Sequence, residues 1–520
     1  MRPHDMGTLF DQCADRGSHT VLHLDRPLDI APEAGTALTV TRLAELTAEL
    51  AGCLAALGAG PGDRVAVVKR NHWDYDLIAC AAIRIGALPA LISGHLPEGA
   101  LESLLKRLEP AVVLTDRPLP AGSARRVLAL GEPWPGATAL DDLRGTPSPP
   151  VRRRGADEPL VVNHTSGTTG APKLVVHTTR TIIDTLARPE SIRWPVVGTR
   201  RDDTVANASS YAHGRTFCWT AAVFSAAPRK IAILSEHDPA IAARVLSEHP
   251  PTTVEALPSA YVRWQRLAAS RDNPFRAVRL YVSTYDAMHP PAVRTLLAAS
   301  QRDRPLWMQG WGQTETGPIT FRFLTRRALA ARSRHPTTRH LGRPLPGGPR
   351  LRVVDPVTFR PLPRGTPGLV LTRTAARCTG YVGEQDRWRA KAIGPWWNTG
   401  DLGVLTRTGA LLLLDREVDT IPGLSCLELE DVIEDRLPEV VECVVLGATG
   451  RLPLPVLVTE DGRIDRDRWC LAVADLPALA EPHTVTWPEV PRTGTGKVRR
   501  LELLTRLLGR AETHGSGRWT

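Results

Sequence analysis

Two hydrophobic patterns alternate along the first hundred residues. Leucines recur every three or four positions over 43–57, which predicts an amphipathic helix. The apolar run at 65–68 predicts a buried strand, and a second helix over 74–85, ended by Gly86, leads to a second strand at 87–92. Strands that alternate with helices in this way favour an α/β fold with parallel-rich sheets.

Short apolar runs continue this pattern through the middle of the chain. They predict further strands at 160–163, 174–177, 279–283, 306–309 and 411–414. Two stretches between them have a different character. Residues 118–156 are rich in Pro, Gly and Arg and are typical of a variable surface segment, and the basic stretch 322–339 is interpreted as a mobile insertion.

The succession of predicted elements changes near residue 415, which predicts a second domain. Beyond it, apolar positions between Leu429 and Leu437 predict a helix, followed by strands at 443–447 and 455–459. We therefore expect a large N-terminal domain over 1–414 with several subdomains and a small, mobile α+β domain over 415–509. Residues 510–520 are expected to form a disordered tail.

Composition indicates an ordinary globular protein. Of 520 residues, 42% are hydrophobic and 23% are charged, and no run approaches the length of a membrane helix. The first residues contain no apolar segment typical of a secretory signal, and no two of the eight cysteines form a CxxC pair. We interpret the cysteines as reduced core residues and expect a cytoplasmic protein without a membrane partner.

The net charge of +10 changes this picture only slightly. Arginines are scattered along the whole chain, and only 5% of residues are aromatic, so we expect no nucleic-acid partner. A basic protein also suits a small polyanionic ligand. The chain contains only six lysines, since arginine supplies most of its positive charge, so a lysine inside a motif carries more weight here than usual.

The strongest chemical signal is a glycine-rich loop between the apolar runs at 160–163 and 174–177. Glycines allow an anion to approach the backbone, hydroxyls and N–H groups donate to phosphate oxygens, and a lysine adds charge. The spacing does not match the Walker A pattern. The candidate phosphate-binding residues are Thr165, Ser166, Gly167, Thr168, Thr169, Gly170 and Lys173.

This loop resembles the phosphate loop of the adenylate-forming superfamily, which includes acyl- and aryl-CoA synthetases, nonribosomal peptide adenylation domains and luciferase. Shorter strings in the order typical of that family extend the resemblance over nearly the whole chain. These strings are 62–67 (GDRVAV), 310–315 (GWGQTE), 398–401 (NTGD), 415–416 (DR) and 491–497 (PRTGTGK).

The resemblance implies an ATP-dependent enzyme that forms AMP, with Mg²⁺ and with ATP at the domain interface. It implies that Glu315 binds Mg²⁺, that Thr314 contacts the α-phosphate, and that Lys497 bridges this phosphate and the attacking oxygen. Trp311, after Gly310, would stack on adenine. Alternatively, Trp311 is a core aromatic residue and Lys497 a solvated lysine of a basic tail.

The same resemblance places three further residues at the nucleotide. Asp401 would accept the ribose hydroxyls, although it could instead be a turn residue after Gly400. Asp286 matches an acidic position next to the adenine site, and Arg416 matches the interdomain arginine.

The expected pocket wall departs from the family pattern. Relatives usually carry two glycines before the acidic position, whereas this chain has Thr284 and Tyr285. A tyrosine there would fill space that an acyl chain occupies, which favours a small or planar substrate, unless its side chain points away. Tyr211 and His213 resemble a segment beside the substrate, and His213 is either a pocket residue or an ordinary hydrogen-bonded histidine.

The hinge region differs as well. Val418 stands where the family usually has Asp or Lys, and the loop at 421–425 is short. Because this loop helps to form the CoA tunnel in relatives, its length leaves the acceptor of the second half-reaction open. The basic stretch 322–339 could contact CoA phosphates or an acidic carrier protein, or it could be a solvated face.

Three functional hypotheses follow. The first is a ligase that activates a small or aromatic carboxylic acid as its AMP ester and passes it to CoA, a carrier-protein thiol or an amine, in bacterial secondary metabolism. The second is a diazotase that adenylates nitrite and couples it to an aromatic amine. The third is an inactive nucleotide-binding scaffold of the same fold. In each case the protein is expected to be a monomer or a homodimer.

Overall fold

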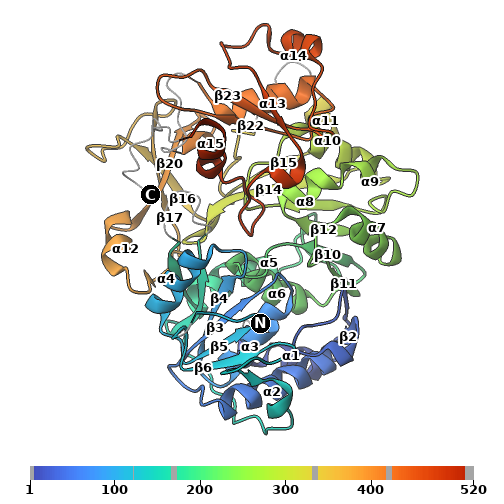
Figure 1. Cartoon of the computed structure of the whole chain (residues 1–520), viewed down its shortest axis with the longest axis vertical. Coiled ribbons are helices and arrows are strands. Elements are labelled where there is room, and N and C mark those ends of the chain that lie inside the picture. Colours follow the sequence, from blue (N-terminus) through green and yellow to red (C-terminus); the bar gives the residue numbers. More distant parts are fainter. Residues whose placement is uncertain (1–4, 121, 166–171, 331–337, 417–423, 510–520) are drawn as a thin grey trace.

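A computed structural model describes residues 5–120, 122–165, 172–330, 338–416 and 424–509 (Figure 1). The predicted α/β class is confirmed, with two large parallel-rich sheets in the N-terminal part and a smaller C-terminal part. In Figure 1 the C-terminal part, coloured orange to red, lies over one end of the larger body.

The first large sheet contains most of the strands predicted near the N-terminus. Its order across the sheet is β18-β9-β8-β4-β3-β5-β6-β7. The bounds are β3 (Arg64–Lys69), β4 (Leu88–Ser93), β5 (Val112–Thr115), β6 (Arg126–Ala129), β7 (Thr138–Ala139), β8 (Pro159–His164), β9 (Leu174–Thr178) and β18 (Gly380–Tyr381). The neighbouring helices are α1 (Leu9–Asp15), α2 (Val40–Ala56), α3 (Asp74–Arg84) and α4 (Glu98–Leu108).

Both faces of this sheet are covered, as its sequence requires. In β3, Val65 and Val67 join a hydrophobic cluster with α2 and α3, whereas Ala66 and Val68 join another with α4. Since alternate residues of a strand face opposite sides, a strand with both faces buried is apolar throughout. The helix predicted from 43 begins earlier, because the Thr39 side chain accepts a hydrogen bond from the backbone of Arg42 and caps the helix.

The second large sheet carries the central strands of the chain. Its order is β15-β14-β13-β12-β10-β11-β1-β2. The bounds are β1 (Val21–Leu24), β2 (Ala37–Thr39), β10 (Thr204–Ala208), β11 (Lys230–Ile233), β12 (Thr253–Ala256), β13 (Leu280–Ser283), β14 (Leu306–Gln313) and β15 (Gly317–Leu324). Its helices are α5 (Arg188–Glu190), α6 (Gly214–Ala226), α7 (Pro239–Glu248), α8 (Pro258–Arg263), α9 (Gln265–Ala269), α10 (Pro290–Ala299) and α11 (Arg326–Ala330).

Two smaller sheets complete the molecule. One contains β16 (Arg350–Val354), β17 (Pro367–Arg373), β19 (Ala392–Ile393), β20 (Trp396–Leu405) and β21 (Leu411–Arg416), with α12 (Gln385–Lys391) beside it. The other contains β22 (Glu442–Leu446), β23 (Leu454–Val458) and β24 (His483–Val485), with α13 (Cys426–Arg436), α14 (Arg466–Val473) and α15 (Arg500–Leu508). The helix and the two strands predicted after residue 415 are therefore confirmed.

Charged contacts join α13 to the larger body. His289 Nδ1 lies 2.6 Å from Asp431 Oδ1, and the backbone N–H of Thr338 donates to Asp431 Oδ2 at 2.6 Å. Burial alone would lower the pKa of His289, but the carboxylates of Glu434 and Asp431 overcome this effect and raise it to about 10. His289 is therefore a cation at neutral pH and forms an ion pair across the contact.

Three predictions about individual segments need correction. Residues 322–324 are not part of an insertion, because they complete β15, and α11 follows within the same stretch; residues 331–337 lie outside the described part. The segment 118–156 contributes β6 and β7 to the first sheet. Seven cysteines are buried and reduced, but Cys470 is exposed.

Among the residues that the structure describes, no helix is long and apolar enough to cross a membrane. The expected tail at 510–520 and the loop around Val418 lie outside the described residues.

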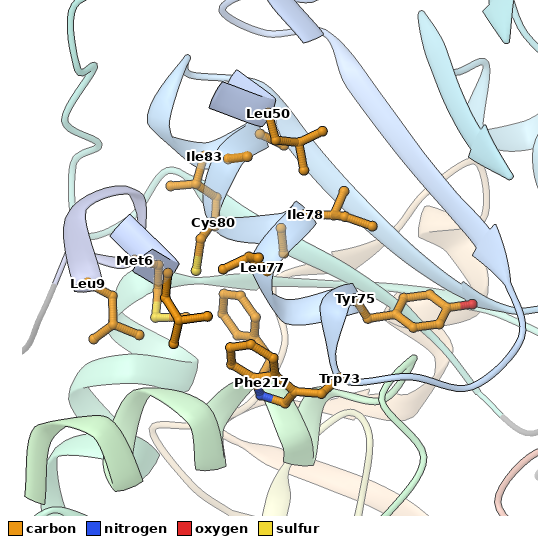
Figure 2. Packing of buried hydrophobic residues seen from close by; sticks show 14 of the residues in the cluster. Met6, Leu9, Leu50, Trp73, Tyr75, Leu77, Ile78, Cys80, Ile83 and Phe217 are labelled. Atoms are coloured by element: carbon orange, nitrogen blue, oxygen red, sulfur yellow. The ribbon is translucent and has the colours of Figure 1, made fainter. Parts of the chain in front are cut away.

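The largest hydrophobic cluster joins the N-terminus to α2, α3 and α6, and Figure 2 shows Trp73 and Phe217 within it. Phe217 is fully buried. We expect Phe217→Ala to lower the free energy of unfolding by about 3–5 kcal/mol, since it leaves a cavity in a packed core. Leu471→Ala, at a site 79% exposed, should change it by less than about 0.5 kcal/mol. Urea unfolding followed by tryptophan fluorescence tests this, and equal effects of the two variants would contradict it.

Candidate active site

A cavity of approximately 1280 Å³ opens where the two large sheets, β20 and a C-terminal loop meet. Its lining combines residues that are distant in sequence and that belong to different motifs. The sequence-predicted residues among them are Thr165, Lys173, His213, Tyr285, Gly310, Thr314, Glu315, Asp401 and Lys497.

The ends of the glycine-rich loop are held together at this cavity. The backbone N–H of Thr165 donates to the Lys173 carbonyl at 3.0 Å, and the backbone N–H of Lys173 donates to Thr165 Oγ1 at 3.1 Å. Ser166, Gly167, Thr168, Thr169 and Gly170 lie outside the described residues. Burial, together with the nearby cation of Lys391, lowers the pKa of Lys173 to about 8, so its ammonium is still largely charged at pH 7.

Glu315 lies between this lysine and a tyrosine that the sequence analysis missed. Its Oε1 is 4.0 Å from Lys173 Nζ and accepts a hydrogen bond of 2.8 Å from the hydroxyl of Tyr381. Burial and the adjacent carboxylate raise the pKa of Tyr381, which keeps the hydroxyl protonated as a donor. Tyr381 comes from β18, 66 residues away, and no local pattern links it to Glu315.

Thr314 is oriented by two histidines. His177 Nε2 lies 2.7 Å from the Thr314 carbonyl, and His213 Nε2 lies 3.3 Å from Thr314 Oγ1. The Nδ1 atom of His213 accepts the backbone N–H of Arg215 at 3.1 Å, so the proton of the neutral ring is on Nε2. Burial, followed by the neighbouring His164 and Lys497, lowers the pKa of His213 to about 3. His213 is therefore neutral and donates to Thr314.

Asp401 is buried beside a residue of the Thr314–Glu315 motif. Gln313 Nε2 donates to Asp401 Oδ2 at 3.0 Å and to the Thr399 carbonyl at 2.6 Å. The side-chain amide thus connects β14 to β20 and fixes the carboxylate at the cavity. Gln313 lies within the GWGQTE string, but the string alone indicates no role for it.

Tyr285 faces the cavity in a strained backbone conformation. Its φ of +77° is uncommon for any residue with a side chain and is an outlier for a bulky one. Its ring centroid lies 4.7 Å from that of His213, and burial raises the pKa of its hydroxyl. The alternative in which Tyr285 points away is therefore wrong, and the two rings together form one wall.

Other candidate residues do not line the cavity. Tyr211 is fully buried, and its hydroxyl donates to the Asn207 carbonyl at 3.1 Å, so it belongs to the core rather than to the pocket. Trp311 is partly buried, packs against a cluster that includes Val353 and Val370, and is not among the lining residues.

Two further residues, Asp286 and Arg416, are expected from the sequence to lie at the nucleotide. Asp286 is exposed and is not among the lining residues. Arg416 ends β21, where its backbone pairs with Asp401, and its side chain lies outside the described part of the chain.

Lys497 reaches the cavity from a loop that fits closely against both large sheets. A Cβ at Gly494 would lie 2.5 Å from Ser93 Oγ at the end of β4, and a Cβ at Gly496 would overlap Ser259 Oγ in α8. Gly496 also has a φ of +77°, in the left-handed region that favours glycine. The backbone N–H of Lys497 donates to Thr493 Oγ1 at 3.2 Å, which closes the turn.

Comparisons with known proteins agree with this arrangement. The 3-amino-2-hydroxy-4-methoxybenzoate diazotase of Streptomyces cremeus is 37% identical over 98% of this chain and 97% of its own length. A 3-aminoavenalumate diazotase of a Streptomyces species is 25% identical over 79% of this chain and 74% of its own length. Among solved structures, the anthranilate CoA ligase AuaEII in complex with anthranoyl-AMP has a TM-score of 0.79 at 19% identity, covering 97% of each chain.

A family profile described as AMP-binding enzyme matches residues 9–382, which include the glycine-rich loop, His213 and the Thr314–Glu315 motif. The chain therefore belongs to the AMP-binding enzyme family of adenylate-forming proteins, and it is an ATP-dependent ligase that forms AMP.

Proposed function

We propose that this ligase is a diazotase, which adenylates nitrite and transfers its nitrosyl group to an aromatic amine. The observation that carries the proposal is the similarity to the Streptomyces cremeus diazotase, which extends over 98% of the chain and therefore covers both the N-terminal body and the region of Lys497. Since both diazotases come from Streptomyces species, a role in bacterial secondary metabolism is part of the proposal.

The shape of the wall beside Thr314 supports a small first substrate. Tyr285 and His213 occupy this wall, and His213 lies within 3.3 Å of Thr314 Oγ1. If Thr314 contacts the α-phosphate, as the family resemblance implies, the attacking oxygen must come from a group that fits beside these two rings. Nitrite is a three-atom anion and meets this condition, whereas a carboxylate carries a substituent that must pass the rings.

The proposed chemistry has two stages. A nitrite oxygen attacks the α-phosphorus of ATP, the bond to pyrophosphate breaks, and a mixed anhydride of nitrite and AMP forms. The neutral amine nitrogen then attacks the nitrosyl nitrogen, AMP leaves, and one proton is lost to give an N-nitrosamine. This tautomerises to a diazohydroxide, which takes up a proton and loses water to give the diazonium ion.

The chain's own residues supply charge and position for the first stage. Lys497 would neutralise charge on the attacking oxygen and the α-phosphate, and Lys173 would hold the outer phosphates. Asp401, fixed by Gln313, would accept the ribose hydroxyls. Because burial raises the pKa of Tyr285, its hydroxyl stays neutral and adds no negative charge to the wall that would repel either anion.

Mg²⁺ fits this site through Glu315. A magnesium ion in nucleotide enzymes is typically held by one or two carboxylates together with substrate phosphates. The described residues contain no cluster of three or more His, Cys, Asp or Glu side chains suited to a metal, and the Glu315 carboxylate beside the phosphates fits the type of site that magnesium uses in nucleotide enzymes. Glu315 would hold the ion, whose positive charge stabilises the charge that develops on the phosphates.

An aromatic amine accepts the activated group, so neither CoA nor a carrier protein is required, in keeping with the short loop at 421–425.

We propose that residues 1–414 form the body and 415–509 the lid that carries Lys497. Two hydrophobic clusters drawn from residues between Cys426 and Leu508 support an independent core for this lid.

The direct test measures AMP and pyrophosphate release from ATP with nitrite, with and without an aromatic amine. We expect nitrite-dependent release and an amine-dependent diazonium ion, which is trapped by azo coupling. Lys497→Ala should lower the rate at least about 100-fold, because a charge that stabilises the transition state is lost. Lys106→Ala, on the exposed face of α4, should match the wild type. Turnover only with carboxylic acids, with or without CoA, would overturn the diazotase proposal in favour of an acyl ligase.

Backbone fit around Lys497 leads to a second prediction. We expect Gly496→Ala to slow adenylation by about 10- to 100-fold, because a Cβ would collide with Ser259 and displace Lys497. Gly450→Ala is the matched control, since Gly450 has a φ of +72° but no atom within contact of an added Cβ. Pyrophosphate exchange and thermal unfolding of both variants make the comparison. Equal rates in the two variants would show that the close approach at Ser259 is not needed.

The wall residue gives a third prediction. Tyr285→Gly should relieve the strain at φ +77° and raise AMP release with benzoate by about tenfold, since space opens beside Thr314. Phe359→Gly is the control, because Phe359 also has a positive φ, +56°, but packs in a cluster that does not line the cavity. The readout is kcat/KM for benzoate against nitrite. An unchanged ratio in Tyr285→Gly would remove Tyr285 from the determinants of substrate size.

A further inference from the structure

Helix α12 presents two cations to the cavity. Arg387 and Lys391 are four residues apart in this helix, so their side chains lie on the same face, and both are half-buried residues of the cavity lining. Arg389, between them in sequence, is not among the lining residues. Its side chain is 67% exposed and pairs with Asp386 at the surface. Neither the family motifs nor the proposed mechanism uses Arg387 or Lys391.

Lysine is rare in this chain, yet it is concentrated at this cavity. Of the six lysines, three line the cavity, namely Lys173, Lys391 and Lys497. A lysine ammonium is a compact charge with three donors that can turn toward phosphate oxygens. Lys173 and Lys497 already have phosphate roles in the proposed mechanism, which favours a ligand of the same kind for Lys391.

Hydrogen bonds attach the start of α12 to the end of the glycine-rich loop. Arg107 of α4 donates through Nη2 to the Pro172 carbonyl at 2.7 Å, and its Nη1 donates to the carboxylate of Glu384, the residue before α12. Glu384 Oε1 also accepts a hydrogen bond of 3.2 Å from Arg387 Nη1. Because Pro172 directly precedes Lys173, these contacts fix α12 relative to the lysine that is proposed to hold the outer phosphates.

A second series of contacts attaches α12 to Glu315. The indole N–H of Trp388 donates to the Cys378 carbonyl at 3.3 Å, and the backbone N–H of Cys378 donates to the Glu315 carbonyl at 2.7 Å. Strand β18, which carries Tyr381 and precedes α12, pairs with β9, the strand that follows Lys173. The position of α12 is therefore set by the segments that carry Lys173 and Glu315.

The charges of α12 act on Lys173. Burial lowers the pKa of Lys173 to about 8, and the cations of Lys391 and Arg387 contribute to this effect, against the carboxylate of Glu315. Since solvent and salt screen charges over short distances, such an effect shows that the three cations converge on one region of the cavity. A polyanion in this region would be attracted by all three and would favour the charged form of Lys173.

The outer phosphates of ATP need a region of this kind. They carry most of the negative charge of the nucleotide. When an acid oxygen attacks the α-phosphorus, the bond to the bridging oxygen breaks, and its electron pair leaves with the β-phosphate as pyrophosphate. Negative charge therefore increases on these phosphates during the reaction. Cations that are already fixed beside them stabilise this charge without having to reorganise.

We propose that Arg387 and Lys391 form, together with Lys173, the site that binds the two outer phosphates of ATP and holds pyrophosphate after the bond breaks. This inference rests on the phosphate role proposed for Lys173. It does not rest on the identity of the acid or of the amine, since adenylation releases pyrophosphate whichever acid attacks. Arg389, on the same helix, takes no part.

The test measures equilibrium binding of ATP, AMP and inorganic pyrophosphate, each with Mg²⁺, to the full-length protein without acid or amine. We expect Arg387→Gln and Lys391→Gln each to raise the Kd of ATP and of pyrophosphate by about tenfold, because a charge-assisted hydrogen bond to phosphate is lost. The Kd of AMP should change by less than about twofold, since AMP lacks the outer phosphates. Isothermal titration calorimetry gives the three constants.

Three further variants separate the phosphate contacts from effects on the fold. Arg389→Gln removes a positive charge from the same helix away from the cavity, so all three constants should match those of the wild type. Lys391→Arg keeps the charge and should retain ATP binding within about threefold. Lys173→Gln is the reference for the phosphate site and should weaken ATP and pyrophosphate but not AMP. Thermal unfolding of each variant is measured alongside.

Two outcomes would overturn the inference at the level of the nucleotide. The first is a ratio of the ATP and AMP dissociation constants that Arg387→Gln and Lys391→Gln both leave unchanged. If Lys173→Gln still changes this ratio, the phosphate role of Lys173 is retained. The second is equal weakening of ATP and AMP, since α12 would then act on the whole nucleotide or on the fold.

A third outcome would assign the two cations to the acceptor instead. In this case the variants would weaken binding of 3-aminobenzoate, measured in the same way, while ATP and pyrophosphate bind as in the wild type. The binding measurements contain no nitrite, so a failure of the diazotase proposal is detected separately, by the absence of nitrite-dependent AMP release.

Discussion

The seating of one C-terminal loop between the two large sheets is the constraint on which the active site depends. Gly494 faces Ser93 at the end of β4, and Gly496 faces Ser259 in α8, so closely that a Cβ added at either glycine would force the neighbouring serine to move. The close fit of the backbone at these two glycines thus fixes the position of Lys497 relative to the cavity. Because the other lining residues come from both sheets, the complete site forms only when all three parts are in contact.

Charged and neutral side chains occupy different parts of the resulting cavity. On the side proposed for the nucleotide, Lys173 and Lys497 line the cavity together with the carboxylates of Glu315 and Asp401. On the inner side, Arg215 is compensated by the two carboxylates of Glu190 and Glu255. Between these two regions, the rings of His213 and Tyr285 are neutral, since burial lowers the pKa of the histidine and raises that of the tyrosine. The separation keeps the phosphates away from the buried carboxylates.

A strained backbone and an unpaired buried hydroxyl both occur in the lining of this cavity. Tyr285 adopts a left-handed backbone conformation, and Thr253 keeps a buried hydroxyl without a partner. Neither feature helps the fold, because each costs free energy that the surrounding packing must offset. Both residues line the same cavity, which agrees with a site shaped for a particular ligand rather than for stability.

The sequence by itself determined the α/β class, the helices α2 and α3, the strands around the glycine-rich loop, and the motifs that carry Lys173, Glu315 and Lys497. These features depend on hydrophobic periodicity and on local strings, which a linear chain displays directly. It placed Tyr211 and Asp286 at the pocket, which neither residue lines, because which face of a strand or loop meets the cavity depends on the neighbouring sheet. Only the tertiary structure brought Tyr381 to Glu315 and two glutamates to Arg215, since residues so distant in sequence meet through packing that no local pattern records.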